Sequence, residues 1–425
     1  MAKMYLLVHN RLNWIYNYLM IVYIKQGEVK EIIMGNLRKI ISATMTATLL
    51  LSMWGCGSTS DKADIGEAGI NCADLVSVDE KDAEAWMDIP SNVCSVDDGA
   101  YIAQGLDTGD FLYYYDYDAK KYTKVCNKPE CSHSDETCNA FLPGAMVGDG
   151  ELYDTSLIQK YDDAIYIGGL DDKKACIYKV ACDGSERGKV IDLFDAEIST
   201  SKDGGATFAE YNSFKFCIHR GYVYYSIDNG QNSSLFRKKL DGSSKSEETI
   251  VSIDEQNDVY RLEPYGRYVF FQKGKYNEDY SDITTTLYAY DTEKNEVVDV
   301  KDDIINVYVI RDDKLYYEVV GEGIYEYSLK DGTESLVVST KDACYNIYKT
   351  ADKYITMSME GLRVYDENGN EIYHIGQDEC RELKYVSDSR LITGAMNEDG
   401  RMEYTFVNNV QDAPDKWDRN TFVFE

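Results

Sequence analysis

A unit of short aromatic strands recurs about every 35 to 50 residues from about Cys94 onward, and this repetition limits the folds open to the chain. The first half of the unit is an aromatic strand that follows an acidic or glycine-containing turn. Four stretches show it clearly: DDAIYIGG at 162–169, RGYVYYSID at 220–228, YGRYVFFQKG at 265–274 and RDDKLYYEVV at 311–320. A second strand with alternating apolar residues follows each of them.

The second strand ends in a turn of Asp, Gly, Asn or Lys, as in SLFRKKLDGS at 234–243. Such turns between alternating strands favour hairpins because Gly and Asp tolerate a positive φ. Tyr, with 37 copies in 425 residues, suits these strands since its ring covers a pleated surface while its hydroxyl reaches water or a partner.

A four-stranded unit of this length cannot bury both of its faces alone, but units stacked in a ring bury one another. We therefore expect an all-β fold, a β-propeller of about seven four-stranded blades within residues 83–425. Six or eight blades also fit the pattern, and a sandwich or solenoid of similar strands is the alternative. The units are expected to begin near residues 94, 157, 212, 259, 303, 344 and 380.

One unit carries a family resemblance. YVYYSIDNGQNSSLFRKKLDGS at 222–243 resembles the YWTD-type propeller repeat of lipoprotein-receptor proteins, where an aromatic strand ending in Asp precedes a strand closing with Leu-Asp-Gly-Ser. The chain is also similar to uncharacterised propeller lipoproteins of Gram-positive bacteria. The resemblance implies a propeller and a surface location, and it implies no activity.

The region before the repeats has the layout of an export signal. Residues 34–55 combine a basic start, an apolar run and a Gly-Cys end, which is typical of a secretory signal. The end resembles the lipobox of bacterial lipoproteins, which implies that Cys56 is lipid-modified after cleavage, although Met53 and Trp54 depart from the lipobox pattern. A plain signal or an uncleaved anchor is the alternative.

The remaining N-terminal segments have simpler interpretations. Residues 1–33 precede a complete signal with its own Met34, so we interpret them as a mis-assigned upstream extension. Residues 56–82 are small, polar and acidic, and they predict a flexible linker behind the lipid anchor. We thus expect a protein held on the extracellular face of the cell membrane.

A cluster of cysteines and one histidine stands out between the first two units. CNKPECSHSDETCNAF at 126–141 places Cys126, Cys131, His133 and Cys138 within thirteen residues. Three thiolates and an imidazole suit a tetrahedral zinc site, although the spacing is not a usual zinc pattern. Disulfide bonding is equally compatible in an exported chain, with Cys72 or Cys94 as further partners, and free thiols are a third alternative.

The rest of the sequence gives no catalytic residue. No nucleophile elbow, zinc-protease motif, phosphate loop or dinucleotide fingerprint is present, and nothing selects an acid–base pair from the many carboxylates. The net charge of −31 opposes nucleic-acid binding. We expect a non-enzymatic binding or scaffold module for an extracellular peptide, glycan or protein. The alternative is a propeller hydrolase or lyase acting on polysaccharide.

Overall fold

A computed structural model describes residues 91–424, with gaps at 107–108, 143–146, 149–150, 153–157, 172–173, 196–197, 201–205, 209–212, 229–232, 245, 253–256, 277–282 and 305–307. The upstream extension, the signal, Cys56 and the linker lie outside the described residues. The chain divides into two units, Met1–Glu67 with Tyr276–Ile283, and Ala68–Lys275 with Thr284–Glu425. Nearly all described residues belong to the second unit.

The described residues form seven four-stranded antiparallel sheets, here called blades 1 to 7, and each blade uses four consecutive strands. The first three blades are β1 (Val93–Ser95), β2 (Gly99–Leu106), β3 (Gly109–Asp116) and β4 (Lys121–Lys124); β7 (Ile158–Tyr161), β8 (Ala164–Asp171), β9 (Lys174–Ala181) and β10 (Arg187–Asp195); and β13 (Ser213–His219), β14 (Tyr222–Asp228), β15 (Ser233–Lys239) and β16 (Glu248–Val251). Blades 4 and 5 are β17 (Asn257–Tyr265), β18 (Tyr268–Tyr276), β19 (Ile283–Asp291) and β20 (Glu296–Asp302); and β21 (Tyr308–Arg311), β22 (Lys314–Val319), β23 (Gly323–Ser328) and β24 (Glu334–Ser339).

The last two blades are β25 (Cys344–Lys349), β26 (Lys353–Ser358), β27 (Gly361–Asp366) and β28 (Glu371–Ile375); and β29 (Glu382–Val386), β30 (Arg390–Met396), β31 (Met402–Asn408) and β32 (Asp418–Val423). Two short hairpins add β5 (Val147–Gly148) with β6 (Glu151–Leu152), and β11 (Ile198–Thr200) with β12 (Ala206–Phe208). A 3-10 turn, η3, covers Pro414–Lys416. Within the described part of the chain, no helix is long and apolar enough to cross a membrane.

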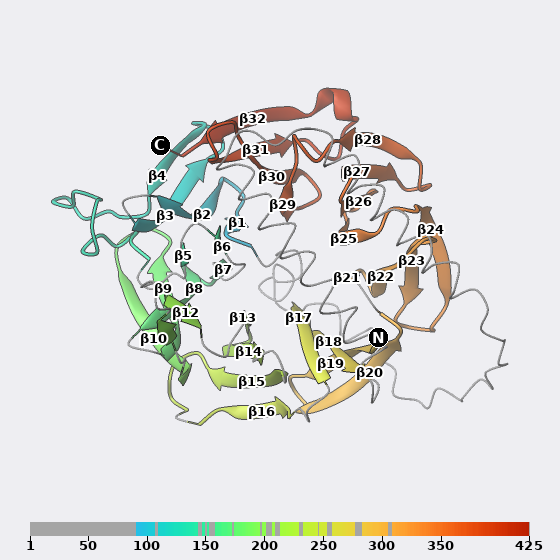
Figure 1. Cartoon of the computed structure of the whole chain (residues 1–425), viewed down its shortest axis with the longest axis horizontal. Helices are drawn as coiled ribbons and strands as arrows, with labels where there is room; N and C mark the ends of the chain where they lie inside the picture. Colours follow the sequence, from blue (N-terminus) through green and yellow to red (C-terminus); the bar gives the residue numbers. More distant parts are fainter. Residues whose placement is uncertain are drawn as a thin grey trace. The chain divides into compact units, whose positions relative to one another are not determined.

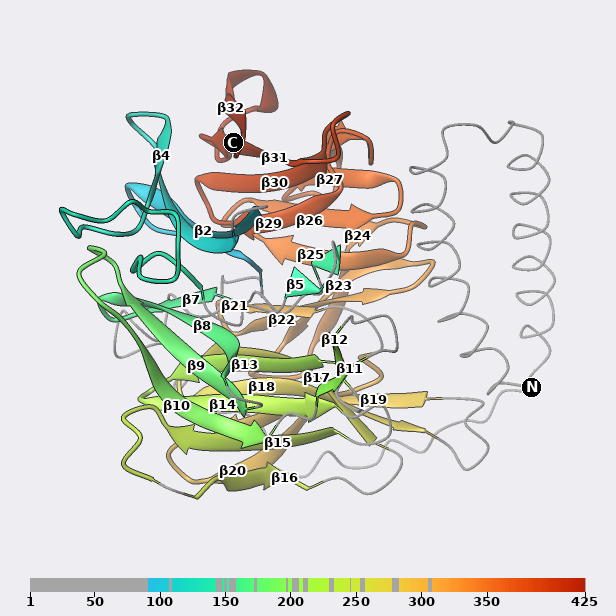
Figure 2. The same ribbon diagram turned by 60° about the vertical axis from the view of Figure 1, so that its left-hand side comes forward.

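The blades follow one another around a ring, with the first strand of each blade on the inside (Figures 1 and 2). Innermost strands of neighbouring blades contact each other, as β7 contacts β13 and β21 contacts β25, and β1 contacts β29 across the ends of the ring. The predicted all-β propeller of seven four-stranded blades is therefore confirmed. Each predicted unit start lies within a few residues of an observed innermost strand.

Glycines allow the strands within a blade to approach closely at equivalent positions. Gly361 begins β27 with φ of 110°, and a Cβ there would lie 2.1 Å from the main-chain oxygen of Ile375. Gly323 begins β23 with φ of 140°, and its Cβ would lie 1.9 Å from the oxygen of Val338. Any side chain at either position would push the third and fourth strands of the blade apart.

Polar side chains also join successive blades. The Gln159 amide in blade 2 donates to the carbonyl oxygen of Ile218 in blade 3 at 2.9 Å, and its Oε1 accepts the Ile218 N–H at 2.6 Å. Glu263 in blade 4 accepts the N–H of Ile310 in blade 5 at 3.1 Å, and Glu318 makes the same kind of contact from blade 5 to blade 6. These bonds satisfy main-chain groups that have no strand partner on the inner edge.

We expect Gln159→Leu to lower the free energy of unfolding by about 2 kcal/mol, because it leaves a buried N–H and a buried carbonyl of Ile218 unpaired. Chemical denaturation of the purified protein measures this loss. Gln377→Leu, at an exposed loop position, is the matched control and should change stability by less than about 0.5 kcal/mol. Equal effects of the two changes would contradict a role for Gln159 in joining the blades.

Glu263 should make the stability depend on pH. Burial raises the pKa of its carboxyl from 4.5 to about 7, although the charge of Arg261 and the Ile310 N–H oppose the rise. Between these two pH values the folded chain keeps a proton that the unfolded chain has released, so the free energy of unfolding falls as pH rises through this window. Glu263→Gln keeps an acceptor for Ile310 but cannot ionise.

The Gln variant should therefore be more stable than the wild type by about 3 kcal/mol at pH 8 and nearly equal to it at pH 4.5. Denaturation midpoints across this pH range measure the difference. A stability difference that is constant with pH would show that Glu263 stays ionised throughout.

The ring closes between blade 7 and blade 1 without exchange of strands, since β1–β4 and β29–β32 each form a complete sheet. Aromatic rings fill this junction. Tyr115 of β3 lies parallel to Phe406 of β31, with ring centroids 4.4 Å apart, and parallel to Phe422 of β32 at 4.7 Å. Tyr115 and Phe406 are almost fully buried.

Polar contacts accompany the aromatic junction. The Asn92 amide donates to the Tyr404 hydroxyl at 2.9 Å, and Ser91 Oγ donates to a main-chain carbonyl of β29 at 2.9 Å. The Arg390 guanidinium lies 3.6 Å from the ring centroid of Tyr117. The junction thus depends on side-chain contacts, and among the described strands no β-ladder crosses it.

Candidate metal centre

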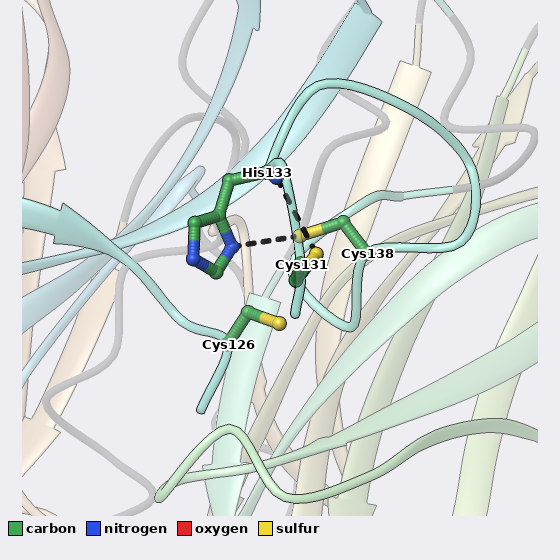
Figure 3. A group of neighbouring side chains, drawn as sticks. All are labelled: Cys126, Cys131, His133 and Cys138. Carbon is green, nitrogen blue, oxygen red and sulfur yellow. Dashed lines mark hydrogen bonds between the residues drawn. The ribbon is translucent and has the colours of Figure 1, made fainter. Parts of the chain in front are cut away.

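The loop that follows β4 brings Cys126, Cys131, His133 and Cys138 together at the edge of blade 1 (Figure 3). One ligand atom from each residue lies within 4.8 Å of the others. Cys138 Sγ is 3.6 Å from His133 Nδ1, and the main-chain N–H of His133 donates to Cys131 Sγ at 3.4 Å. The four residues predicted from the sequence are therefore one cluster in space.

Hydrogen bonds inside the loop fold it back on itself. The N–H of Cys138 donates to Asp135 O at 3.0 Å, and the N–H of Cys131 donates to Lys128 O at 3.2 Å. His133 adopts a left-handed φ of 55°, which turns the chain between its two neighbouring cysteines. These turns allow residues up to twelve positions apart to face one point.

Blade 2 supports the loop from the side. The Arg187 guanidinium of β10 donates to the carbonyl oxygens of Cys138 at 3.0 Å, Phe141 at 2.6 Å and Glu136 at 2.9 Å. Gly184, at φ of 73°, lies so close that a Cβ would be 2.7 Å from the Cys126 nitrogen. The cluster is consequently fixed by two blades.

The three thiols differ in their surroundings. Cys138 is fully buried, whereas Cys126, Cys131 and His133 are half-buried. Burial and the neighbouring thiols raise the pKa of Cys138 to about 11. Burial also acts to raise the pKa of Cys126, but main-chain N–H groups of Lys128 and Asn139 and the other thiols outweigh it and lower the value. In the absence of a cation, the cluster thus favours a thiolate at Cys126 over one at Cys138.

This arrangement can hold a metal ion. Cys126, Cys131 and Cys138 are all free thiols in the structure, so their sulfur atoms are available as ligands. Three sulfurs and one imidazole nitrogen would fill the four positions around a tetrahedral ion and leave none for substrate, which is the composition of a structural site. Of the three alternatives that the sequence left open, the geometry fits metal binding best, since the four ligand atoms converge on one point.

The other residues considered from the sequence have structural surroundings. His219 is buried, and its Nε2 lies 2.7 Å from Gly266 O. His374 is exposed, with Nε2 3.0 Å from Glu360 O. Asp162 and Asp312, from the acidic pairs, are turn residues with positive φ, as expected for turns. None of these residues belongs to the cluster.

The sequence did not predict the residues that support the loop. Arg187 and Gly184 lie about 50 residues further along the chain, in a neighbouring blade, and no spacing pattern links them to the cysteines. The Asp-Gly pair at 183–184 is readable as a hairpin turn, but its contact with Cys126 depends on how two blades pack. That contact is a tertiary property.

Comparison with known proteins supports the fold alone. No family model and no curated protein matches the chain. A puromycin-hydrolyzing peptidase from Mycobacterium tuberculosis matches at a TM-score of 0.51 and 10% identity, covering 80% of this chain and 53% of that one. This chain therefore spans about half of that structure, and a likeness at this identity says nothing about activity.

Two further solved structures match more weakly. An oligogalacturonate lyase from Vibrio parahaemolyticus has a TM-score of 0.43 at 12% identity, covering 61% of this chain and 74% of that one. BamB from Moraxella catarrhalis has a TM-score of 0.39 at 12% identity, covering 78% of this chain and 84% of that one. The class that the fold and the cluster define is a seven-bladed β-propeller with a Cys3His site able to hold a metal.

Proposed function

We propose that the chain is a lipid-anchored protein of the extracellular cell surface whose propeller binds a peptide, glycan or protein without catalysing a reaction. The export signal and the lipobox-like end before Cys56 support the location.

The distribution of perturbed carboxyl groups is the observation that favours binding over catalysis. Hydrolysis by carboxylates needs two of them at a set separation, with the pKa of one raised. Burial raises the pKa of Asp110 to about 6, that of Glu263 to about 7, and also that of Asp313. These three residues lie in blades 1, 4 and 5, and none of the three carboxyls contributes to the pKa shift of another.

The histidines also argue against acid–base chemistry. The imidazoles of His219 and His374 lie at hydrogen-bond distance from main-chain carbonyls, and that of His133 belongs to the cysteine cluster. These are the three imidazoles of the described residues, and each lies beside a main-chain carbonyl or within the cysteine cluster. A binding role requires none of them.

Glycan and peptide arrays probed with the purified full-length chain test this function. We expect a ligand that is retained and recovered intact. Appearance of shortened saccharide or peptide products would overturn the proposal in favour of a hydrolase or lyase. Labelling with radioactive palmitate tests the anchor, and Cys56→Ser should abolish the label if Cys56 carries the lipid.

We also propose that the Cys3His cluster holds a structural zinc ion. Thiolate and imidazole ligands in a closed tetrahedral set are typical of zinc. Elemental analysis of the purified chain should give about one zinc per molecule, with or without reductant. A chain without zinc and with Cys126, Cys131 or Cys138 in a disulfide would overturn this assignment.

A further inference from the structure

Arg261 interrupts the innermost strand of blade 4 with an unusual backbone conformation. Its φ is 42°, and the pairing of β17 with β18 shifts register between Tyr260 and Leu262, so Arg261 is the extra residue of a β-bulge. Among the described residues it is the only non-glycine residue of positive φ inside a strand; the others lie in turns and loops. A bulge of this kind re-aims its side chain and carries backbone strain.

The re-aimed side chain carries a buried donor without a hydrogen-bond partner among the described residues. Its guanidinium carbon lies 5.3 Å from the ring centroid of Tyr308, and its Nη1 is buried and unpaired within the described part of the molecule. A cation–π contact does not satisfy the N–H donors of a guanidinium. Buried donors without partners are rare in folded proteins, and each costs stability.

Two tyrosine hydroxyls near Arg261 are in the same condition. Tyr308 of β21 is fully buried and Tyr348 of β25 nearly so, and the hydroxyl of each is buried without a hydrogen-bond partner in the described structure. Burial raises the pKa of both, and the charges of Arg261 and Glu263 act on both. Three hydrogen-bond donor groups thus gather from the inner strands of blades 4, 5 and 6, which Figure 1 shows as neighbours around the ring.

The group is accessible in part and carries little net charge of its own. Arg261 and Glu263 are partly exposed, whereas Nη1 of Arg261 and both tyrosine hydroxyls are buried. The Glu263 carboxyl, whose pKa burial raises to about 7, accepts the Ile310 N–H. Below neutral pH the guanidinium is therefore the one full charge among these four side chains, and it lacks an acceptor.

We propose that Arg261, Tyr308 and Tyr348 form a binding site for the carboxylate of an acidic sugar or other small organic acid. A carboxylate has two coplanar oxygens that match a guanidinium and accept additional hydroxyl donors. It satisfies the three unpaired groups together. This inference rests on the proposed binding function and names the ligand chemistry at its centre.

The charge balance favours a carboxylate over a divalent anion such as sulfate. One guanidinium compensates a single negative charge, whereas sulfate carries two. The net charge of −31 on the whole chain adds a penalty for each further negative charge on a ligand. Hence the site is expected to prefer a monovalent acid.

Calorimetric titration of the full-length chain at pH 6 tests the site, with D-glucuronate as the probe and D-glucose and inorganic sulfate as comparisons. We expect glucuronate to bind at least about tenfold more tightly than either comparison. The double variant Tyr308→Phe/Tyr348→Phe should weaken glucuronate binding at least about tenfold. It should not lower the melting temperature, because both hydroxyls are unpaired without ligand.

Tyr404→Phe is the matched control, since the Tyr404 hydroxyl is hydrogen-bonded to Gln104 and Asn92 at the ring junction. It should lower the melting temperature and leave glucuronate binding unchanged. Equal binding of glucuronate and glucose, undiminished binding by the double Phe variant, or no glucuronate binding at all would each overturn the site. A retained array ligand alongside any of these results would leave the binding function standing while the site fails.

Discussion

Replacing Phe406 with alanine should lower the free energy of unfolding by about 4 kcal/mol. Phe406 is almost fully buried and lies between Tyr115 of blade 1 and Phe422 of blade 7, with centroid distances of 4.4 and 5.3 Å. Truncation leaves a cavity between blades 1 and 7, the one pair of neighbouring described blades that no loop joins directly. Chemical denaturation measures the loss, and hydrogen exchange should show faster exchange in β3 and β31 than in other blades.

Phe271→Ala is the matched control for this prediction. Phe271 is fully buried at the interface of blades 3 and 4, which are also joined by the chain itself. It should cost a similar free energy of unfolding, yet hydrogen exchange in blades 1 and 7 should stay slow below the global transition. If both variants loosened blades 1 and 7 equally, the junction would have no special role in closing the ring.

Removing zinc from the Cys3His cluster should lower the free energy of unfolding by about 4 kcal/mol when the ion is present at roughly a thousand times its dissociation constant. A bound ion would hold the three sulfurs and the imidazole at one point, so its loss would free the segment from Cys126 to Cys138. Thermal unfolding with and without a chelator measures the effect. Cys131→Ser should unfold at the chelator-treated temperature in both conditions.

Cys182→Ser supplies the control for thiol substitution. Cys182 is half-buried beside blade 1 and is not among the four clustered residues. This variant should retain zinc and the full response to chelator. A chelator response that persisted in Cys131→Ser, or that vanished in Cys182→Ser, would contradict metal binding by the predicted four residues.

The repeated pattern predicted the blades well because each blade is a local structure. Alternating strands and Asp-Gly turns, such as Asp241-Gly242, specify hairpins, and the hairpins of one blade lie within about 45 residues of sequence. Each blade must then bury both of its faces against neighbouring blades, and a ring of blades achieves this. The junction of Tyr115 with Phe406 was not predictable, since it joins residues almost 300 positions apart by packing alone.

The candidate metal centre was predicted for the same reason, since its four ligands lie in one short loop. Arg187, which holds that loop, was not predicted because a basic residue on a strand is usually a solvated one. Arg261 was likewise hidden. Its bulge appears only when β17 pairs with β18, and its unpaired state depends on tyrosines from two further blades.

The manner of ring closure has a consequence for how the chain could be rearranged. Every blade is a continuous stretch of sequence. The outer strand of one blade is followed by a linker to the inner strand of the next at six junctions, and β32 and β1 at the seventh junction have no such linker between them. A linker from the C-terminus to β1 would thus give all seven junctions the same connection, from the outer strand of one blade to the inner strand of the next. The same seven sheets could then be encoded from a new start at any of them, and duplication of one such stretch would insert a whole blade.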